Sequence, residues 1–122
     1  MKSQLVGELV ERVTQFNVKH NIQNPPTMWN LSYLANALTG ETGEIANCVK
    51  KMLRDGVSEE LRQNLFEEIV DNQIYIAMLI EMTGMDFDAY FVKKEAELEQ
   101  RFARYQQRGF SVQDNMKKEW DN

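Results

Sequence analysis

The 122-residue chain contains few of the residues that usually announce a site, with one cysteine, one histidine and two prolines. Because Cys48 is alone, the chain has no internal disulfide and no cysteine-based zinc cluster, and this cysteine usage fits a reducing cytoplasm. With His20 as its one histidine, the chain lacks the two Glu-x-x-His motifs of a di-iron helix bundle. The chemistry of any site must therefore come from other residues.

Long apolar runs are also missing. No stretch approaches the roughly 20 apolar residues of a membrane span, and residues 1–13 lack the apolar centre of a signal peptide. The composition, 43% hydrophobic and 27% charged, is that of a soluble protein, and the length predicts one domain over residues 1–122. The net charge of −5 argues against a nucleic-acid partner. We expect a cytoplasmic protein without membrane or nucleic-acid partners.

Four segments have helical periodicity and little β-branched alternation. They cover about residues 3–20, 27–54, 58–83 and 86–107, and a short amphipathic helix with Met116 and Trp120 would follow. Predicted N-caps begin three of them, at Thr27, Ser58 and Asp86, and turn residues separate them, at Pro25-Pro26, Gly56, Gly84 and Gly109. The expected fold is all-α, an antiparallel four-helix bundle with a short C-terminal helix. Because the third segment is apolar on nearly every side, we also expect an oligomer.

Two carboxylate pairs dominate the chain, Glu41 with Glu44 and Glu68 with Asp71. At i,i+3 spacing the two side chains of a pair lie side by side on one helix surface. With about 100° per residue, Glu41 falls in the middle of an apolar stripe and Glu44 at its edge. That stripe consists of Leu34, Ala37, Ile45, Cys48 and Met52. Asp71 falls within the equivalent stripe of the third segment. Four inward-facing acids are therefore predicted.

Four clustered acids repel one another, and each close pair costs on the order of 4 kcal/mol at an effective dielectric near 20. One E-x-x-E step is usually a solvated helix face, but two such pairs on the apolar stripes of neighbouring helices are much harder to explain by chance. A divalent cation would stabilise them, and an all-oxygen ligand set favours Mg²⁺, with Mn²⁺ as the alternative. We predict a metal site at Glu41, Glu44, Glu68 and Asp71.

The fourth segment has a charge anomaly of the opposite sign. Its apolar stripe consists of Phe87, Phe91, Leu98, Phe102 and Tyr105. Lys94 falls in the centre of this stripe and Arg101 at its flank. The two cations would thus face the acids of the other helices, although Lys94 could equally pack its stem in the core and extend its amine to solvent.

The paired motifs Glu41-x-x-Glu44 and Glu68-x-x-Asp71, on consecutive predicted helices, resemble the signature of MazG-like nucleoside triphosphate pyrophosphohydrolases. The flanking residues 38–47, Lys50-Lys51, residues 54–56 and Tyr75 extend the resemblance over roughly residues 29–105. It implies that the four acids are both metal ligands and catalytic residues. It also implies cleavage between the α- and β-phosphates, release of pyrophosphate, and a dimer or tetramer.

The resemblance assigns substrate contacts as well. Lys51, Lys94 and Arg101 would bind the outgoing pyrophosphate, with Lys50 and Arg54 as further candidates. The base would meet aromatic surfaces that precede or adjoin the acidic helices. The candidates are Phe16, Trp29, Tyr75, His20 and Tyr33. Trp29 has the alternative interpretation of a core residue at a helix start. One departure is Leu98, which stands where many relatives carry a substrate-binding asparagine, so nucleotide preference stays open.

Three functions remain in view. The leading one is hydrolysis of (deoxy)nucleoside triphosphates in nucleotide-pool house-cleaning. A second uses similar residues on another phosphorylated substrate such as phosphoribosyl-ATP. A third is a non-catalytic helical association module whose acids hold a structural cation.

Overall fold

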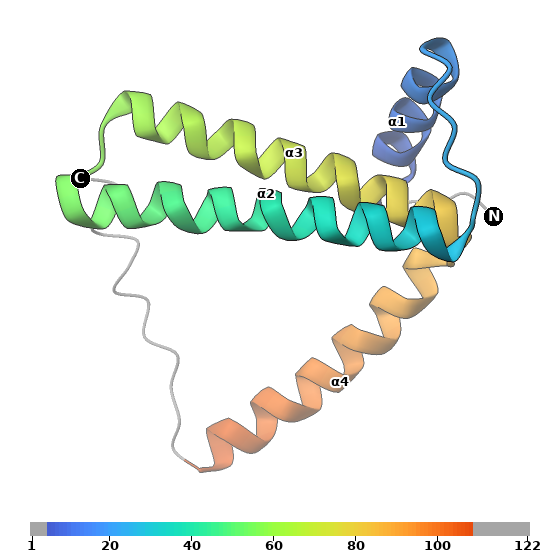
Figure 1. Cartoon of the computed structure of the whole chain (residues 1–122). Helices are drawn as coiled ribbons and strands as arrows, with labels where there is room; N and C mark the ends of the chain where they lie inside the picture. Colours follow the sequence, from blue (N-terminus) through green and yellow to red (C-terminus); the bar gives the residue numbers. More distant parts are fainter. Residues whose placement is uncertain (1–4, 109–122) are drawn as a thin grey trace. The chain divides into compact units, whose positions relative to one another are not determined.

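The computed structural model describes residues 5–108 and contains four helices in this range, with no strand. They are α1 (Gly7–Lys19), α2 (Met28–Asp55), α3 (Glu59–Thr83) and α4 (Phe87–Gln107) (Figure 1). The all-α class is thus confirmed. The chain divides into two compact units, residues 1–86 with α1–α3 and residues 87–122 with α4. The single domain over residues 1–122 stays a prediction. The predicted C-terminal helix lies outside the described residues.

The starts of α2 and α3 are those predicted from their caps. Thr27 Oγ1 accepts a hydrogen bond from the Asn30 N–H at 3.1 Å, and Ser58 Oγ accepts one from the Leu61 N–H at 3.1 Å. Each cap satisfies a backbone donor that has no partner inside the helix. Gly84 closes α3 in the left-handed conformation, with φ of 65°, and donates to the Ile80 carbonyl. Local sequence therefore sets these boundaries.

The end of α1 differs in cause from the prediction. The helix stops at Lys19, several residues before Pro25, because Asn21 adopts the left-handed conformation with φ of 56°. The N–H groups of Ile22 and Asn21 then bond to the carbonyls of Asn17 and Val18, at 2.8 and 3.2 Å. This pair of bonds is the Schellman motif, which reverses the chain at a helix end. The helix also begins later than expected, at Gly7, since Val6 offers no side-chain cap.

Helices α2 and α3 run antiparallel, side by side, and the three residues 56–58 connect them (Figure 1). The apolar side chains buried in residues 5–108 all come from these two helices: Leu34, Cys48, Met52, Leu65, Ala77, Ile80 and Met82. Near the connection, Cys48, Met52 and Leu65 form one cluster, against which Ile45 and Leu61 pack. The predicted stripe of α2 is therefore the surface that meets α3.

Helix α1 packs against the later half of α3 (Figure 1). The contact face of α1 contains half-buried Val10 and Val13, and Val6, just before the helix, is half-buried too. Leu5, Leu9 and Phe16, which helical periodicity places on the same apolar side, are exposed. A helix that packs on one neighbour buries only a narrow strip of its surface.

The early half of α3 keeps apolar side chains in solvent, including Phe66 at 43%, Ile69 at 41% and Val70 at 56% exposure. Helices α1 and α2 thus cover only part of the apolar surface of α3. No helix in residues 5–108 is long and apolar enough to cross a membrane.

Candidate metal centre

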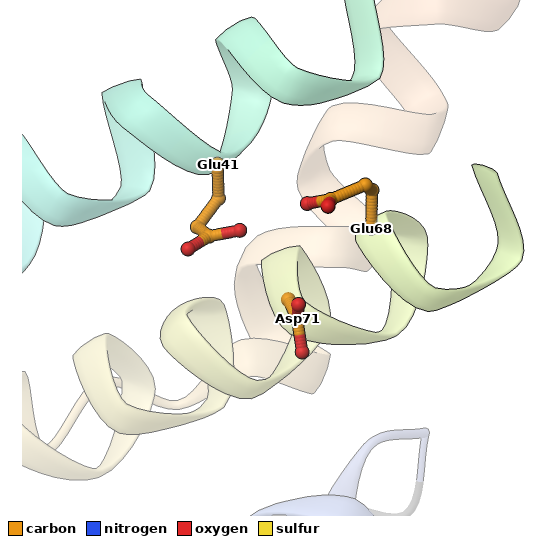
Figure 2. Close-up of side chains that lie close together, drawn as sticks. All are labelled: Glu41, Glu68 and Asp71. Carbon is orange, nitrogen blue, oxygen red and sulfur yellow. The ribbon is translucent and has the colours of Figure 1, made fainter. Parts of the chain in front are cut away.

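Three of the four predicted acids meet between α2 and α3. Glu41 of α2 and Glu68 and Asp71 of α3 each place a carboxylate oxygen within 4.8 Å of the others. Figure 2 shows Glu41 extending from α2 toward Glu68 on the facing helix, with Asp71 beside them. The antiparallel pairing of α2 and α3 therefore brings together residues 27 or more positions apart in the sequence.

Burial separates the two members of each predicted pair. Glu41 and Glu68 are half-buried, whereas Glu44 and Asp71 are exposed. The prediction of four acids on buried faces is thus wrong for Glu44 and Asp71. The reason is geometric. Two positions at i,i+3 are related by a rotation of about 300° around the helix axis, so only one of the two side chains can point straight at a single neighbouring helix. Asp71 still reaches the cluster from its rim, while Glu44 lies outside the group of three.

Glu68 is the most constrained of the acids. Its Oε2 atom is inaccessible to solvent and has no hydrogen-bond partner among the described residues. Burial raises the pKa of Glu68 above its ordinary value, and a hydrogen bond to Glu41 together with the charges of Glu41, Asp71 and Glu44 raises it further. Each cause disfavours the ionised carboxylate. Without a cation, the cluster therefore favours the protonated form of Glu68.

The residues fit a hard divalent cation. A buried acceptor without a donor costs free energy that a bound cation would remove. The three acids offer oxygen ligands only, which suits Mg²⁺ or Mn²⁺ better than zinc or copper. The negative charge of Glu44 also raises the pKa of Glu68, so Glu44 lies close enough to the three acids to interact with Glu68. Glu41, Glu68 and Asp71 would hold the ion, with Glu44 near enough to share it through water.

A polar contact between the helices lies next to these acids. Thr42 Oγ1 is 2.9 Å from Asn72 Oδ1, and Asn72 Nδ2 donates to the Glu68 carbonyl at 2.7 Å. Asn72 is 6% exposed and is the buried polar residue of the described chain. Because Thr42 follows Glu41 and Asn72 follows Asp71, this contact fixes the register in which the acids meet. We refer to it as the Thr42–Asn72 contact.

Sequence reasoning did not select Thr42 or Asn72, although a signal existed. Asn72 lies only about 40° from Glu68 around α3, on the inward side. A buried amide needs a partner, so its angle predicted a polar contact across the helix pair. Which residue of α2 would supply the partner depends on the register of the two helices, and the sequence does not give that register.

Lys51 lies close to the acids. It lines a groove between α2 and α3 together with Glu44, Glu68 and Asn64. Lys50 is also exposed but does not line this groove, and Arg54 is paired with Asp55 through two hydrogen bonds of 2.9 and 2.7 Å. Of the three cations predicted on α2, Lys51 is therefore the one next to the acids.

The aromatic candidates for base binding are mostly far from the acids or solvent-exposed. Trp29 is 81% exposed, so its interpretation as a core residue is wrong. It precedes Glu41 by 12 residues, about 18 Å along α2. Phe16 and Tyr33 are exposed as well, while Phe16 contacts His20 with ring centroids 4.4 Å apart. Tyr75 is half-buried, one turn after Asp71.

The two cations predicted on α4 belong to the other compact unit. Lys94 forms an ion pair with Glu97 of its own helix at 3.3 Å, and its side chain is 62% exposed. Arg101 is exposed too, and the apolar stripe of α4 has no buried member. A role for Lys94 and Arg101 toward substrate stays a prediction, as does the consequence of Leu98.

Comparisons with known proteins give one short similarity. The Gene 37 protein of Mycobacterium phage L5 is 48% identical over 52 residues, which cover 40% of this chain and 46% of the phage protein. The similarity thus spans less than half the length of that relative, and its name states no activity. No family model matches the chain. No solved structure matches it either.

Proposed function

We propose that the chain is a MazG-like, Mg²⁺-dependent enzyme that hydrolyses (deoxy)nucleoside triphosphates between the α- and β-phosphates. The products would be a nucleoside monophosphate and pyrophosphate, and the setting would be cytoplasmic nucleotide-pool house-cleaning. The supporting observation is the convergence of Glu41, Glu68 and Asp71 within 4.8 Å, with one Glu68 oxygen buried and lacking a partner. A cluster of this kind is unfavourable on its own, and a cation with its phosphate ligand would make it favourable.

Glu41, Glu68 and Asp71 would hold the cation, which when bound neutralises phosphate charge and lowers the pKa of a water molecule. Glu41 comes from the helix opposite Asp71 and has a half-buried carboxylate. In the proposed reaction it would orient the attacking water and accept its proton. Lys51, in the groove beside Glu68, would bind the departing pyrophosphate.

Self-association is part of the proposal. Phe66, Ile69 and Val70 leave apolar surface exposed on α3, and a second copy in a dimer or tetramer would cover it. The same surface also favours the alternative of a non-catalytic association module with a structural cation. Hydrolysis of phosphoribosyl-ATP is a further alternative on the same acids, since in the proposed reaction they would act at the phosphates and not at the base.

The direct test is to incubate the protein with each common nucleoside triphosphate and with phosphoribosyl-ATP, with and without Mg²⁺, and to measure pyrophosphate and orthophosphate separately. We expect pyrophosphate as the first product, only with the metal present. Orthophosphate as the first product, or no turnover of any substrate, contradicts the proposal. Turnover of phosphoribosyl-ATP alone favours the second alternative.

Isosteric variants separate chemistry from folding. Glu68→Gln and Asp71→Asn should lower kcat/KM at least about 100-fold, because each removes a charged ligand. Glu60→Gln, on an exposed site of the same helix, should leave the rate unchanged. Circular dichroism should show equal helix content in all three. If Glu68→Gln keeps the wild-type rate, the acids do not have the proposed role.

A further inference from the structure

A separate pocket lies between the end of α1 and the last turns of α3. Its lining includes Asn17 and Asn24, together with Met78, Glu81 and Met82. Its volume is about 170 Å³, below the ~300–1,000 Å³ of sites that enclose a whole drug-sized ligand. It would therefore admit one ring system of a larger molecule. We call it the amide pocket.

The Schellman motif at the end of α1 builds this pocket. Because Asn21 is left-handed, the Ile22 N–H returns to the Asn17 carbonyl at 2.8 Å. The reversal places Ile22 and Asn24 beside Asn17, and all three line the pocket. The wall is therefore set by local backbone geometry and not by a flexible connection.

The pocket combines an apolar floor with unused hydrogen-bonding groups. Met82 is buried and Met78 half-buried, and thioether side chains pack well against flat rings. Asn17 and Asn24 are half-buried, and within residues 5–108 neither side-chain amide has a hydrogen-bond partner. Each amide offers both donors and an acceptor. Glu81 adds an exposed carboxylate at the rim, and none of the lining residues is a cation. The lining suits an uncharged polar ring and disfavours phosphate.

The amide pocket and the metal centre share one face of α3. Met78 and Met82 follow Asp71 by 7 and 11 residues, so they lie within about 20° of it around the helix and roughly 10 and 16 Å farther along the axis. This separation is comparable with the reach of a nucleotide from its phosphates to its base. A substrate with phosphates at Asp71 would extend its base toward the methionines.

We infer that the amide pocket binds the nucleobase of the substrate and favours bases that carry an exocyclic amino group, guanine first. This inference rests on the proposed function and adds the specificity of the same site. Glu81 accepts from N–H donors only. Guanine presents two adjacent donors to one carboxylate, whereas the N–H of thymine and uracil is flanked by two carbonyl oxygens that a carboxylate repels. The side-chain amides of Asn17 and Asn24 then form hydrogen bonds with the remaining polar atoms at the edge of the base.

Nucleosides without phosphate test the pocket independently of catalysis. In full-length protein with ¹³C-methyl methionine and no metal, deoxyguanosine should shift the Met78 and Met82 methyl signals. Met28, exposed at the start of α2, is the internal control and should not respond. Thymidine should bind about tenfold more weakly. Equal affinity for both nucleosides, or no response of Met78 and Met82, overturns the inference.

Variants of the pocket sharpen this result. Glu81→Gln should reduce the preference for deoxyguanosine over thymidine about tenfold, because an amide no longer repels the carbonyl oxygens. Asn21→Gly should preserve the response, since glycine adopts the left-handed conformation freely, whereas Asn21→Val should weaken it. An unchanged preference in Glu81→Gln overturns the role of this carboxylate.

The outcomes distinguish the two proposals. Methyl shifts with deoxyguanosine in a protein that hydrolyses no nucleotide would support the pocket and contradict the enzyme. Release of pyrophosphate with a base preference that is identical in wild type, Asn17→Asp and Glu81→Gln would support the enzyme and overturn the pocket.

Discussion

Two regions of the α2–α3 interface use the same pair of helices with opposite chemistry. Near the connection, Cys48, Met52 and Leu65 pack as an apolar region. Within about two turns along the same faces, a polar region presents Glu41, Glu68 and the Thr42–Asn72 contact. The apolar region supplies burial, which favours pairing of the helices. The polar region opposes pairing, because it desolvates a carboxylate and gathers negative charge.

This difference indicates how a small helical protein can hold a strained acidic centre. Burial in the apolar region keeps the helices together, so the acids of the polar region cannot separate to relieve their repulsion. Asn72 adds a directional contact that apolar side chains cannot give. Changes in the apolar region, in the polar contact and in the protonation of the acids should therefore have distinct effects.

The largest change in stability should come from the apolar region. Met52→Ala removes a 6% exposed side chain from the cluster and should lower the free energy of unfolding by about 2–5 kcal/mol. Leu53→Ala, at the neighbouring position with 86% exposure, is the matched control and should change it by less than ~0.5 kcal/mol. Urea unfolding followed by circular dichroism measures both. Equal losses of stability in the two variants would mean that the buried side of α2, which contains Met52, does not stabilise the fold more than its exposed side.

A smaller effect should follow from breaking the Thr42–Asn72 contact. Thr42→Val leaves the buried Asn72 Oδ1 without its donor and should cost about 1–3 kcal/mol. Asn72→Leu should cost less, because Thr42 Oγ1 still donates to the Leu38 carbonyl at 2.9 Å. The double variant should cost less than the sum, with a coupling of roughly 1 kcal/mol. Thr39→Val is the control, because Thr39 bonds only to its own helix, at the Ala35 carbonyl. A strictly additive cycle would show that the contact does not join the helices.

The same variants should also weaken Mg²⁺ binding, measured by isothermal titration calorimetry, because the contact sets the register of the ligands. Thr39→Val should keep the wild-type affinity. Loss of stability with unchanged affinity would limit the contact to a structural role.

The smallest effect concerns protonation. Since the pKa of Glu68 is raised in the folded state, the folded metal-free protein holds this proton more tightly than the unfolded chain. Its contribution to stability is complete below the ordinary pKa and is lost as the pH rises through the folded pKa. In EDTA, wild type should therefore lose stability relative to Glu68→Gln as the pH rises above 4.5, the ordinary pKa of a glutamate. Urea unfolding at several pH values tests this.

Metal binding should show the opposite trend, because the cation competes with the proton. Mg²⁺ affinity should rise over the same pH range. An affinity independent of pH would mean that Glu68 is ionised before the metal binds.

Much of the helical framework could be predicted from the sequence because the relevant interactions are local. The Thr27 and Ser58 caps act within three residues, and the buried side of α2 follows from its periodicity. The end of α1 was attributed to the wrong residues. Asn21 ends the helix because its backbone adopts a positive φ angle. An asparagine makes this left-handed conformation more accessible, but its presence in the sequence does not dictate it.

The candidate site was predictable in composition but not in geometry. Helical angles selected Glu41 and Glu68 as inward-facing, and these two acids are half-buried. They also selected Asp71 as buried, and it lies at the rim. Angles around one helix do not say how closely, or in what register, the next helix approaches. Trp29 shows the same limit. As an aromatic residue at a helix start it could have been a core residue, and the structure leaves it exposed to solvent.

The sequence by itself determined where α2 and α3 begin, which of their faces are apolar, and that acidic residues interrupt those faces. The reason is that hydrogen bonds and side-chain periodicity within a helix involve residues only a few positions apart. Tertiary structure decided that Glu41 meets Glu68, that Thr42 faces Asn72, and that Asn17 and Asn24 share a pocket with Met78. These pairings depend on the register between helices, which is set by the summed packing of many side chains and not by any one of them.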